Sequence, residues 1–161
     1  MILLAFVRNI MEMKNKGFSM IELIVVIAIL AILTGALAPM LIRYIAKARL
    51  STDIDTGQQI ARAIMNCVTD DSAKDNAVEH ASPHPVNDMD GNDFKKAVFD
   101  MLGATQFTGK SKKDADGNEF DSDKMQFYYT LDAEKNKVEV FYGGTTADYQ
   151  IYPQTGSKLL K

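Results

Sequence analysis

The feature that most constrains this chain is the long apolar run from Met20 to Ile42. A helix needs about 20 residues to cross the ~30 Å hydrocarbon core of a bilayer, and this run has that length. Only a few residues interrupt its apolar character: Glu22, Thr34, Gly35 and Pro39. The run therefore predicts a membrane-spanning helix near the start of the chain.

Charges on either side of the run predict its orientation. Three basic residues and one acid precede it: Arg8, Lys14, Lys16 and Glu12. Because cytoplasmic flanks carry an excess of Lys and Arg, we expect the N-terminus in the cytoplasm and the C-terminal region outside. Basic residues also follow the run and weaken this asymmetry: Arg43, Lys47 and Arg49.

Glu22 lies inside the apolar run and calls for compensation. An acidic residue at the bilayer centre costs roughly 2.5 to 3.5 kcal/mol, and less near the edge. One interpretation places Glu22 among the lipid headgroups, in contact with water. Another supplies a cation: cleavage between Gly17 and Phe18 would create an α-amine one helical turn from Glu22. Between chains staggered along a shared axis, that amine can meet the carboxylate of a neighbour and set the register of a filament.

At this point the sequence resembles a known family. The stretch Lys14-Asn15-Lys16-Gly17-Phe18-Ser19-Met20-Ile21-Glu22, followed by the apolar run, is similar to the class III signal of type IV pilins and of type II secretion pseudopilins. The resemblance implies that a membrane prepilin peptidase removes a leader, residues 1–17, by cutting after Gly17. It also implies N-methylation of Phe18 and a docking role for Glu22. Gly35 and Pro39 form either a tolerated kink in the helix or, as the resemblance implies, a hinge that extends or melts on assembly.

Two other interpretations of the N-terminal region remain open. A secretory signal peptide would find a small-x-small site at Ala36-Leu37-Ala38, but Pro39 is a poor residue to follow a scissile bond. The run could also be an uncleaved single-pass anchor for a soluble binding domain. Leaders of the resembling family are commonly short and basic, so Met11 or Met13 would make a more typical start than Met1.

Composition excludes some classes of protein. Without the leader the chain keeps 15 basic and 20 acidic residues, and this net negative charge argues against a general nucleic-acid partner. The single cysteine, Cys67, cannot form an internal disulfide, and we expect it to be a small buried residue. The resembling Gram-negative pilins often have a C-terminal disulfide loop, so its absence favours a Gram-positive type of pilin or a pseudopilin.

Beyond the membrane segment, residues 43–161 predict one pilin-like globular domain. Residues 18–42 are the expected transmembrane and assembly half of one long helix. Residues 43–69 continue this helix in amphipathic form, with an apolar stripe at three- and four-residue spacing. We expect that stripe to pack on the domain. Its members are Ala46, Leu50, Ile54, Gly57, Ala61, Ile64 and Val68, whereas the polar face holds Lys47, Arg49, Asp53, Asp55, Gln58, Gln59 and Arg62.

The rest of the domain predicts a loop and then a sheet. Residues 70–105 are expected to form a connecting loop, in which 92–102 is a short helix capped by Asn92 and stopped by Gly103. Residues 106–153 predict an antiparallel sheet with strands near 125–131, 138–142 and 149–152, and 154–161 form a tail. The predicted fold class is therefore α+β, a long N-terminal helix packed on a small antiparallel sheet.

Signals for site chemistry are few. Pro83 and Pro85 prevent a helix that would aim both His80 and His84 at one metal, so a zinc site is not expected. Two acidic runs, 88–93 and 114–119, share the pattern Asp-x-Asp-Gly-Asn-acid, which suits either calcium or a plain surface turn. The resembling pseudopilins bind calcium in a C-terminal loop, which adds weight to the second run, with these candidate ligands: Asp114, Asp116, Asn118, Asp121 and Asp123.

The sequence thus predicts a structural subunit of a type IV pilus-like filament and no enzyme, since no nucleophile has a recognisable base. The expected partners are other pilins in a homo- or hetero-oligomeric filament, the prepilin peptidase, an inner-membrane assembly platform, and lipid before assembly. The expected location is the cytoplasmic membrane, then a pilus on the cell surface. Within the resemblance, a pseudopilin of a type II secretion or competence system is the alternative.

Overall fold

The structure is a computed structural model that describes residues 18–70 and 75–160. The chain divides into two compact units, Met1–Leu41 and Ile42–Lys161. The predicted leader, residues 1–17, lies outside the described residues. One helix, α2 (Met20–Thr69), contributes to both units.

Helix α2 contains 50 residues and includes Pro39 in its interior. It covers both predicted helical segments and ends at Thr69, which confirms the expected end of the amphipathic half. In the second unit, the apolar stripe of this half is buried, as expected: Leu50, Gly57, Ala61, Ile64 and Val68. A Cβ atom at Gly57 would overlap the Ile151 side chain, which would have to shift, so glycine favours this close approach of α2 to strand β4 (Gln150–Tyr152).

The sheet has four antiparallel strands in the order β1-β2-β3-β4. Together with the long helix it gives the chain the predicted α+β fold class. Strand β1 is His80–Pro85, β2 is Phe127–Asp132 and β3 is Lys137–Tyr142. Strands β2 and β3 pair without a shift from Phe127 opposite Tyr142 to Asp132 opposite Lys137. Alternate residues of β2 are buried, because the period of two turns one face of the sheet toward the core.

Strand β1 corrects the sequence analysis, which predicted a loop over 70–92. Residues 80–85 include no β-branched residue but contain two prolines, so their sequence does not predict a strand. It forms a strand because its backbone pairs with β2 at the edge of the sheet, where proline is tolerated. By contrast, the first part of the predicted sheet region, residues 106–126, contributes no strand to this sheet. It contains the 3-10 helix η2 (Ser122–Lys124) and an isolated bridge between Lys113 and Glu119.

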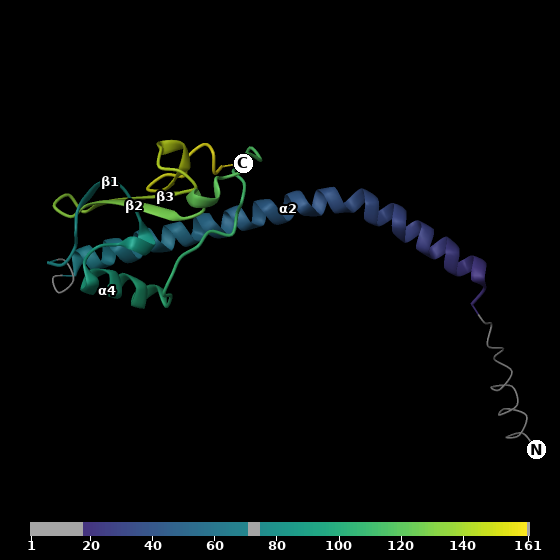
Figure 1. The fold of residues 1–161 in the computed structure, drawn as a ribbon, viewed down its shortest axis with the longest axis horizontal. Helices are drawn as coiled ribbons and strands as arrows, with labels where there is room; N and C mark the ends of the chain where they lie inside the picture. Colours follow the sequence, from purple (N-terminus) through teal and green to yellow (C-terminus); the bar gives the residue numbers. More distant parts are fainter. Residues whose placement is uncertain (1–17, 71–74, 161) are drawn as a thin grey trace, which may run out of the picture. The chain divides into compact units, whose positions relative to one another are not determined.

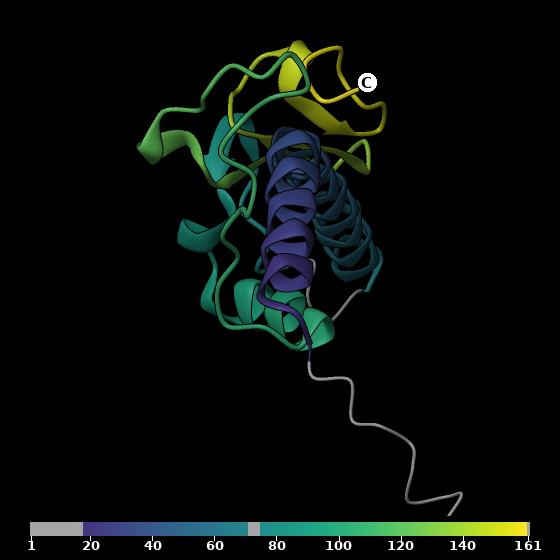
Figure 2. The same ribbon diagram turned by 90° about the vertical axis from the view of Figure 1, so that its right-hand side faces the viewer.

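Helix α4 (Asn92–Leu102) is the predicted short helix. Its N-cap residue is Gly91, not Asn92, because Asn92 is already helical, and Gly103 ends the helix with a φ of 63° as expected. Two more 3-10 helices, η1 (Val86–Asp88) and η3 (Ala147–Tyr149), precede α4 and β4. Within this unit, the C-terminal half of α2 lies between the sheet and α4 (Figures 1 and 2).

The core of the second unit lies between these layers. Ile60 and Ile64 of α2 are fully buried together with Phe94 of α4 and Tyr129 of β2. Cys67 is also buried, as predicted, and burial raises the pKa of its thiol. Fully burying one aliphatic or aromatic side chain contributes about 1.5 to 3 kcal/mol, so this layer supplies the main stabilisation of the unit.

Asp53 was predicted to lie on the exposed polar face of α2, but it is buried. Its side chain is 1% exposed, and its carboxylate accepts hydrogen bonds from the backbone N–H groups of Lys110 and Ser111 at 2.6 to 3.0 Å. The Tyr142 hydroxyl donates to the Ser111 carbonyl at 2.6 Å and completes the attachment of this loop. Asp53 thus attaches α2 to the loop around Lys110 and Ser111, two residues that belong to no helix or strand.

Candidate assembly site at the start of helix α2

The start of α2 is closed by a reciprocal pair of side chains. The Ser19 hydroxyl accepts a hydrogen bond from the Ile21 N–H at 3.3 Å, and Glu22 accepts one from the Ser19 N–H at 2.9 Å. This is a capping box, in which a serine before the helix and an acid three residues later satisfy free N–H groups. The side chain of Glu22 therefore bends back toward the first residue outside the helix.

This arrangement changes the interpretation of Glu22. The sequence analysis sought a cation for its charge, but the helix itself offers partial compensation. A carboxylate in the first turn interacts favourably with the N-terminal end of the helix dipole and with the Ser19 N–H. Ser19 was not predicted to take part in this site, although the pattern Ser-x-x-Glu before an apolar run is typical of a capping box.

Of the two residues of the predicted cleavage site, the structure describes Phe18 but not Gly17. Gly17 lies outside the described residues, so the cut and the leader stay predictions. Phe18 directly precedes the cap, lies in no helix or strand, and is 79% exposed. A peptidase would find the C-terminal side of the predicted cut next to a helix start that is already ordered.

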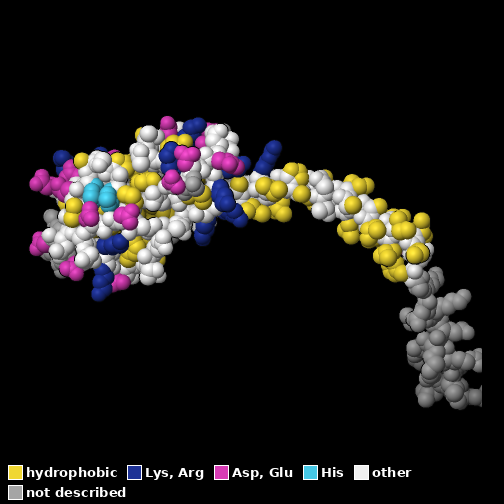
Figure 3. Space-filling model, viewed as in Figure 1, with side chains coloured by type: hydrophobic (Ala, Val, Ile, Leu, Met, Phe, Trp, Pro, Cys, Tyr) yellow, Lys and Arg dark blue, Asp and Glu magenta, His cyan; other side chains and the backbone are white. Residues whose placement is uncertain are grey.

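After the cap, the first half of α2 presents apolar side chains to its surroundings on all sides. An 18-residue window in α2 reaches a mean hydropathy of 2.7, and none of it is buried. Large exposed side chains occur throughout this half, as Figure 3 shows in yellow. They include Ile21, Leu23, Ile27, Leu30, Leu33, Leu37 and Leu41. By length and composition α2 is the one helix in the described chain able to cross a membrane.

The predicted hinge residues lie within this half, and α2 is helical through both of them. Pro39 has no N–H group, so it cannot donate to the carbonyl of Gly35, which stands four residues before it. A Cβ atom at Gly35 would have no neighbour within 4 Å. The two residues thus remove one backbone hydrogen bond and one side chain from the same part of the helix, while the hinge function stays a prediction.

The predicted calcium residues form a turn held by nitrogen donors. Asp114 is buried, and its carboxylate accepts hydrogen bonds from the backbone N–H groups of Asp116 and Asn118 at 2.9 Å each. Lys158 lies 3.0 Å from the Asp116 carboxylate, and Lys124 lies 2.6 Å from that of Asp121. Oxygens arranged in this way bind N–H and ammonium groups and do not form a calcium cage as they stand. Calcium at 114–123, including Asp123, stays a prediction.

His80 and His84 do come together, against the expectation from the prolines. The segment forms no helix, as predicted, but as strand β1 it stacks the two rings with centroids 4.2 Å apart. Among the described residues, one set of three His, Cys, Asp or Glu side chains is close enough to share a metal ion: His80, His84 and Asp90.

The long capped helix with an exposed apolar half, followed by a domain of four antiparallel strands, defines a pilin-like protein. Residues 13–38 match the family described as "Prokaryotic N-terminal methylation motif". The chain is also 38% identical over 60 residues to the type IV major fimbrial protein FimA of Dichelobacter nodosus. Both findings show a similarity to type IV pilins over part of the chain.

The similarity to FimA has a limited extent. The matched residues are 37% of this chain and 38% of the relative, so the match spans well under half of either protein. No solved structure matches the chain. The globular unit, residues 42–161, is therefore interpreted from its own geometry.

Proposed function

We propose that this chain is a structural subunit of a type IV pilus-like filament and that it polymerises through the first half of α2. The observation that carries the proposal is the exposed apolar half of the helix, which begins directly at a methylation motif. A surface of this size and apolar character is stable only in lipid or against similar helices. Assembly would exchange lipid contacts for contacts between the helices of neighbouring subunits.

Processing comes before assembly in this proposal. A prepilin peptidase cuts after Gly17 and methylates the amine of Phe18, which then lies one helical turn from Glu22. In the filament, the amine of one subunit meets the Glu22 carboxylate of another, and the two charges neutralise each other away from water. The cap supports this step because the Ser19 N–H holds the carboxylate at the N-terminal end of the helix.

The proposed topology follows the flanking charges. The leader is cytoplasmic, the helix spans the cytoplasmic membrane once, and the globular unit lies outside. From there an inner-membrane assembly platform draws subunits into a filament at the cell surface. The role is structural and not catalytic.

The intact mass of the protein isolated from cell envelopes tests this processing. We expect the mass of residues 18–161 plus one methyl group. The control is a Gly17→Ala variant, which should keep its leader if the glycine defines the cut. An unmodified N-terminus in the wild type would instead support the rival function, an uncleaved single-pass anchor for a binding domain.

Filament incorporation of a Glu22→Ala variant tests the assembly step separately. We expect the variant to reach the membrane and to be cleaved normally, but to be absent from sheared filaments. Normal incorporation would overturn the charge-pairing mechanism while leaving the processing intact.

A pseudopilin of a type II secretion or competence system is the second candidate within the same family. The candidate calcium turn at 114–123 gives it one specific point of support, because calcium in a C-terminal loop is implied by the resemblance to pseudopilins. A calcium ion would have to displace Lys158 from Asp116. The melting temperature in calcium and in chelator tests the proposal, and an unchanged value would remove it.

A further inference from the structure

An irregularity in β1 brings the two histidines onto one face of the sheet. His80 pairs opposite Leu131 and His84 opposite Tyr129, so four residue steps on β1 match only two on β2. The extra residues are accommodated in a bulge between the histidines. Positions two apart on a strand face the same side, so the imidazole rings stack, with an angle of 5° between their planes.

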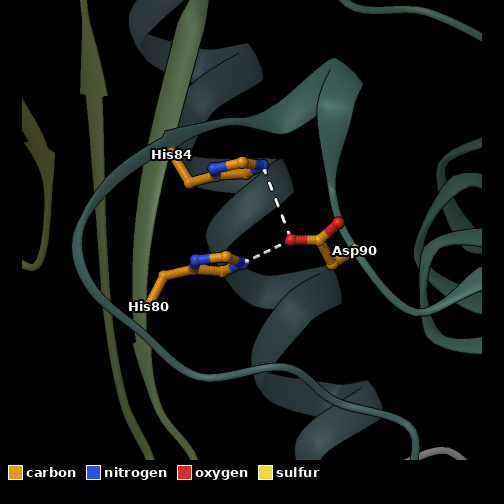
Figure 4. A group of neighbouring side chains, drawn as sticks. All are labelled: His80, His84 and Asp90. Atoms are coloured by element: carbon orange, nitrogen blue, oxygen red, sulfur yellow. Dashed lines mark ion pairs between the residues drawn. The ribbon is translucent and has the colours of Figure 1, made fainter.

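A carboxylate faces the stacked rings from a separate loop. Asp90 precedes α4, and Gly91 next to it has a φ of 79°, a conformation that favours glycine. The Asp90 Oδ2 atom lies 3.4 Å from Nε2 of His80 and 3.9 Å from Nε2 of His84. Figure 4 shows both Nε2 atoms directed at the same oxygen.

One buried ring nitrogen at this corner, Nε2 of His80, has no hydrogen-bond partner within the described part of the chain. The Tyr129 ring lies edge-on to both imidazoles, with centroids 5.4 and 6.1 Å away. Buried polar groups are nearly always hydrogen-bonded, and the 3.4 Å between Nε2 of His80 and the Asp90 carboxylate is longer than a usual hydrogen bond, so this nitrogen calls for an explanation. A bound cation would supply the missing partner of His80.

The cluster is closed on one side and open on the other. The His80 side chain is 15% exposed and lies against Tyr129, whereas that of Asp90 is 57% exposed. Histidine side chains reach the surface of this face, next to acidic ones (Figure 3). An ion could therefore enter from solvent and reach the two histidines on the face of the sheet.

We propose that His80, His84 and Asp90 form a binding site for a divalent transition-metal ion of the zinc class. Two imidazole nitrogens and one carboxylate oxygen are a common ligand set for such ions, whereas calcium and magnesium require oxygen. Three protein ligands leave at least one coordination position for water. All three ligands belong to the second unit, so the proposal does not depend on polymerisation through the apolar half of α2.

Binding requires two small changes. Nε2 of His84 lies 2.8 Å from the Asp88 carbonyl oxygen, to which it can only donate, so its proton must move to Nδ1 before the nitrogen can bind a metal. The three ligand atoms lie within 4.8 Å of one another. Bonds of about 2.0 to 2.1 Å in a tetrahedral site separate ligands by about 3.3 Å, so the widest separation in the set must close by up to about 1.5 Å. An edge strand and an exposed aspartate permit such a shift.

Titration of the untagged full-length chain with zinc in detergent, after chelator treatment, tests the site. We expect one zinc ion per chain, and calcium in excess should not compete. Because the chain has only two histidines, proton NMR of the imidazole C–H groups reports the ligands without any variant. Zinc should shift the signals of both rings, and shifts of neither or of only one would overturn the proposal.

Substitutions at the two more exposed ligands test the assignment of the set. Asp90→Asn keeps the side-chain volume, and His84→Gln keeps a polar group, so both variants should fold like the wild type. Each should weaken zinc binding by about tenfold or more, since even changes outside the ligand set cost about 10- to 100-fold. The matched controls are Asp88→Asn, two residues away, and Asp116→Asn in the candidate calcium turn.

Both controls should bind zinc like the wild type. If Asp90→Asn binds as tightly as the wild type, Asp90 and His80 form only an ion pair and the three-ligand site is wrong. If Asp116→Asn weakens binding as much as Asp90→Asn, the ion lies in the other acidic turn and the proposal is also wrong.

Discussion

The two halves of helix α2 share a backbone conformation but differ in where their apolar side chains find partners. From Met20 to Ile42 the large apolar side chains are exposed in the isolated chain, whereas from Leu50 to Val68 one stripe is buried. The second half is stabilised by the sheet and α4 of its own chain. The first half has to contact lipid or other subunits instead. One half of the helix therefore stabilises the globular unit, and the other half serves assembly.

A matched pair of substitutions tests this division most strongly. Ile64 is fully buried in the second half, and Ile32 is 73% exposed in the first. Ile64→Ala should lower the free energy of unfolding of the globular unit by about 2 to 5 kcal/mol, because it leaves a cavity among packed side chains. The melting temperature in detergent should fall by about 5 to 20 °C.

Ile32→Ala, the control on the same helix, should leave that melting temperature unchanged within about 1 °C. Ile32→Ala should instead lower the yield of filaments. A large loss of thermal stability in Ile32→Ala would show that the two halves are not energetically separate.

Asp53 offers a second test, because it is a buried polar residue on the stabilising half. Asp53→Ala leaves the N–H groups of Lys110 and Ser111 without their acceptor and should cost about 2 to 4 kcal/mol. Asp55→Ala is the matched control, since Asp55 is exposed two residues further on. Equal and small effects of the two substitutions, measured by chemical denaturation, would mean that the loop is held by Tyr142 alone.

The pH dependence of Asp53 sharpens the same point. Burial raises the pKa of Asp53 above its ordinary value of 3.8, although the N–H groups of Lys110 and Ser111 partly oppose this. The folded state therefore binds the proton more tightly than the unfolded state. The contribution of this group is fully present below pH 3.8 and is lost as the pH rises through the raised pKa.

We therefore expect the stability of the wild type, relative to Asp53→Asn, to decline as the pH rises from about 4 toward neutrality. Denaturation of both proteins at a series of pH values measures this difference. Asp132 has the opposite slope, because its hydrogen bond with Lys135 lowers its pKa, but it is common to both proteins and cancels in the comparison. A relative stability that rises over this range would contradict the raised pKa of Asp53.

These tests also show which features could be predicted from the sequence. The apolar run, the buried stripe and strands β2 and β3 follow from local periodicity, and the structure confirms them. Strand β1 could not be predicted, because it exists only through pairing with β2, some 45 residues further along the chain. The burial of Asp53 likewise depends on a loop 57 residues away.

The candidate sites divide in the same way. The cap of Ser19 and Glu22 is encoded within four residues and could have been found by pattern. The cluster of His80, His84 and Asp90 depends on a bulge in β1 and a glycine turn before α4, neither of which a spacing rule anticipates. The prolines, taken as evidence against a metal site, only exclude a helical one.

The smallest expected effect separates the two roles of Glu22. Glu22→Gln keeps an acceptor for the Ser19 N–H but removes the charge, whereas Ser19→Ala keeps the charge and removes the other half of the cap. Loss of a cap costs only about 1 kcal/mol, confined to the first turn, so neither variant should change the stability of the globular unit. If charge pairing drives assembly, Glu22→Gln should fail to enter filaments and Ser19→Ala should enter them. If Glu22→Gln assembles normally and Ser19→Ala does not, Glu22 serves the start of its own helix, and the contact between subunits must come from the apolar surface alone.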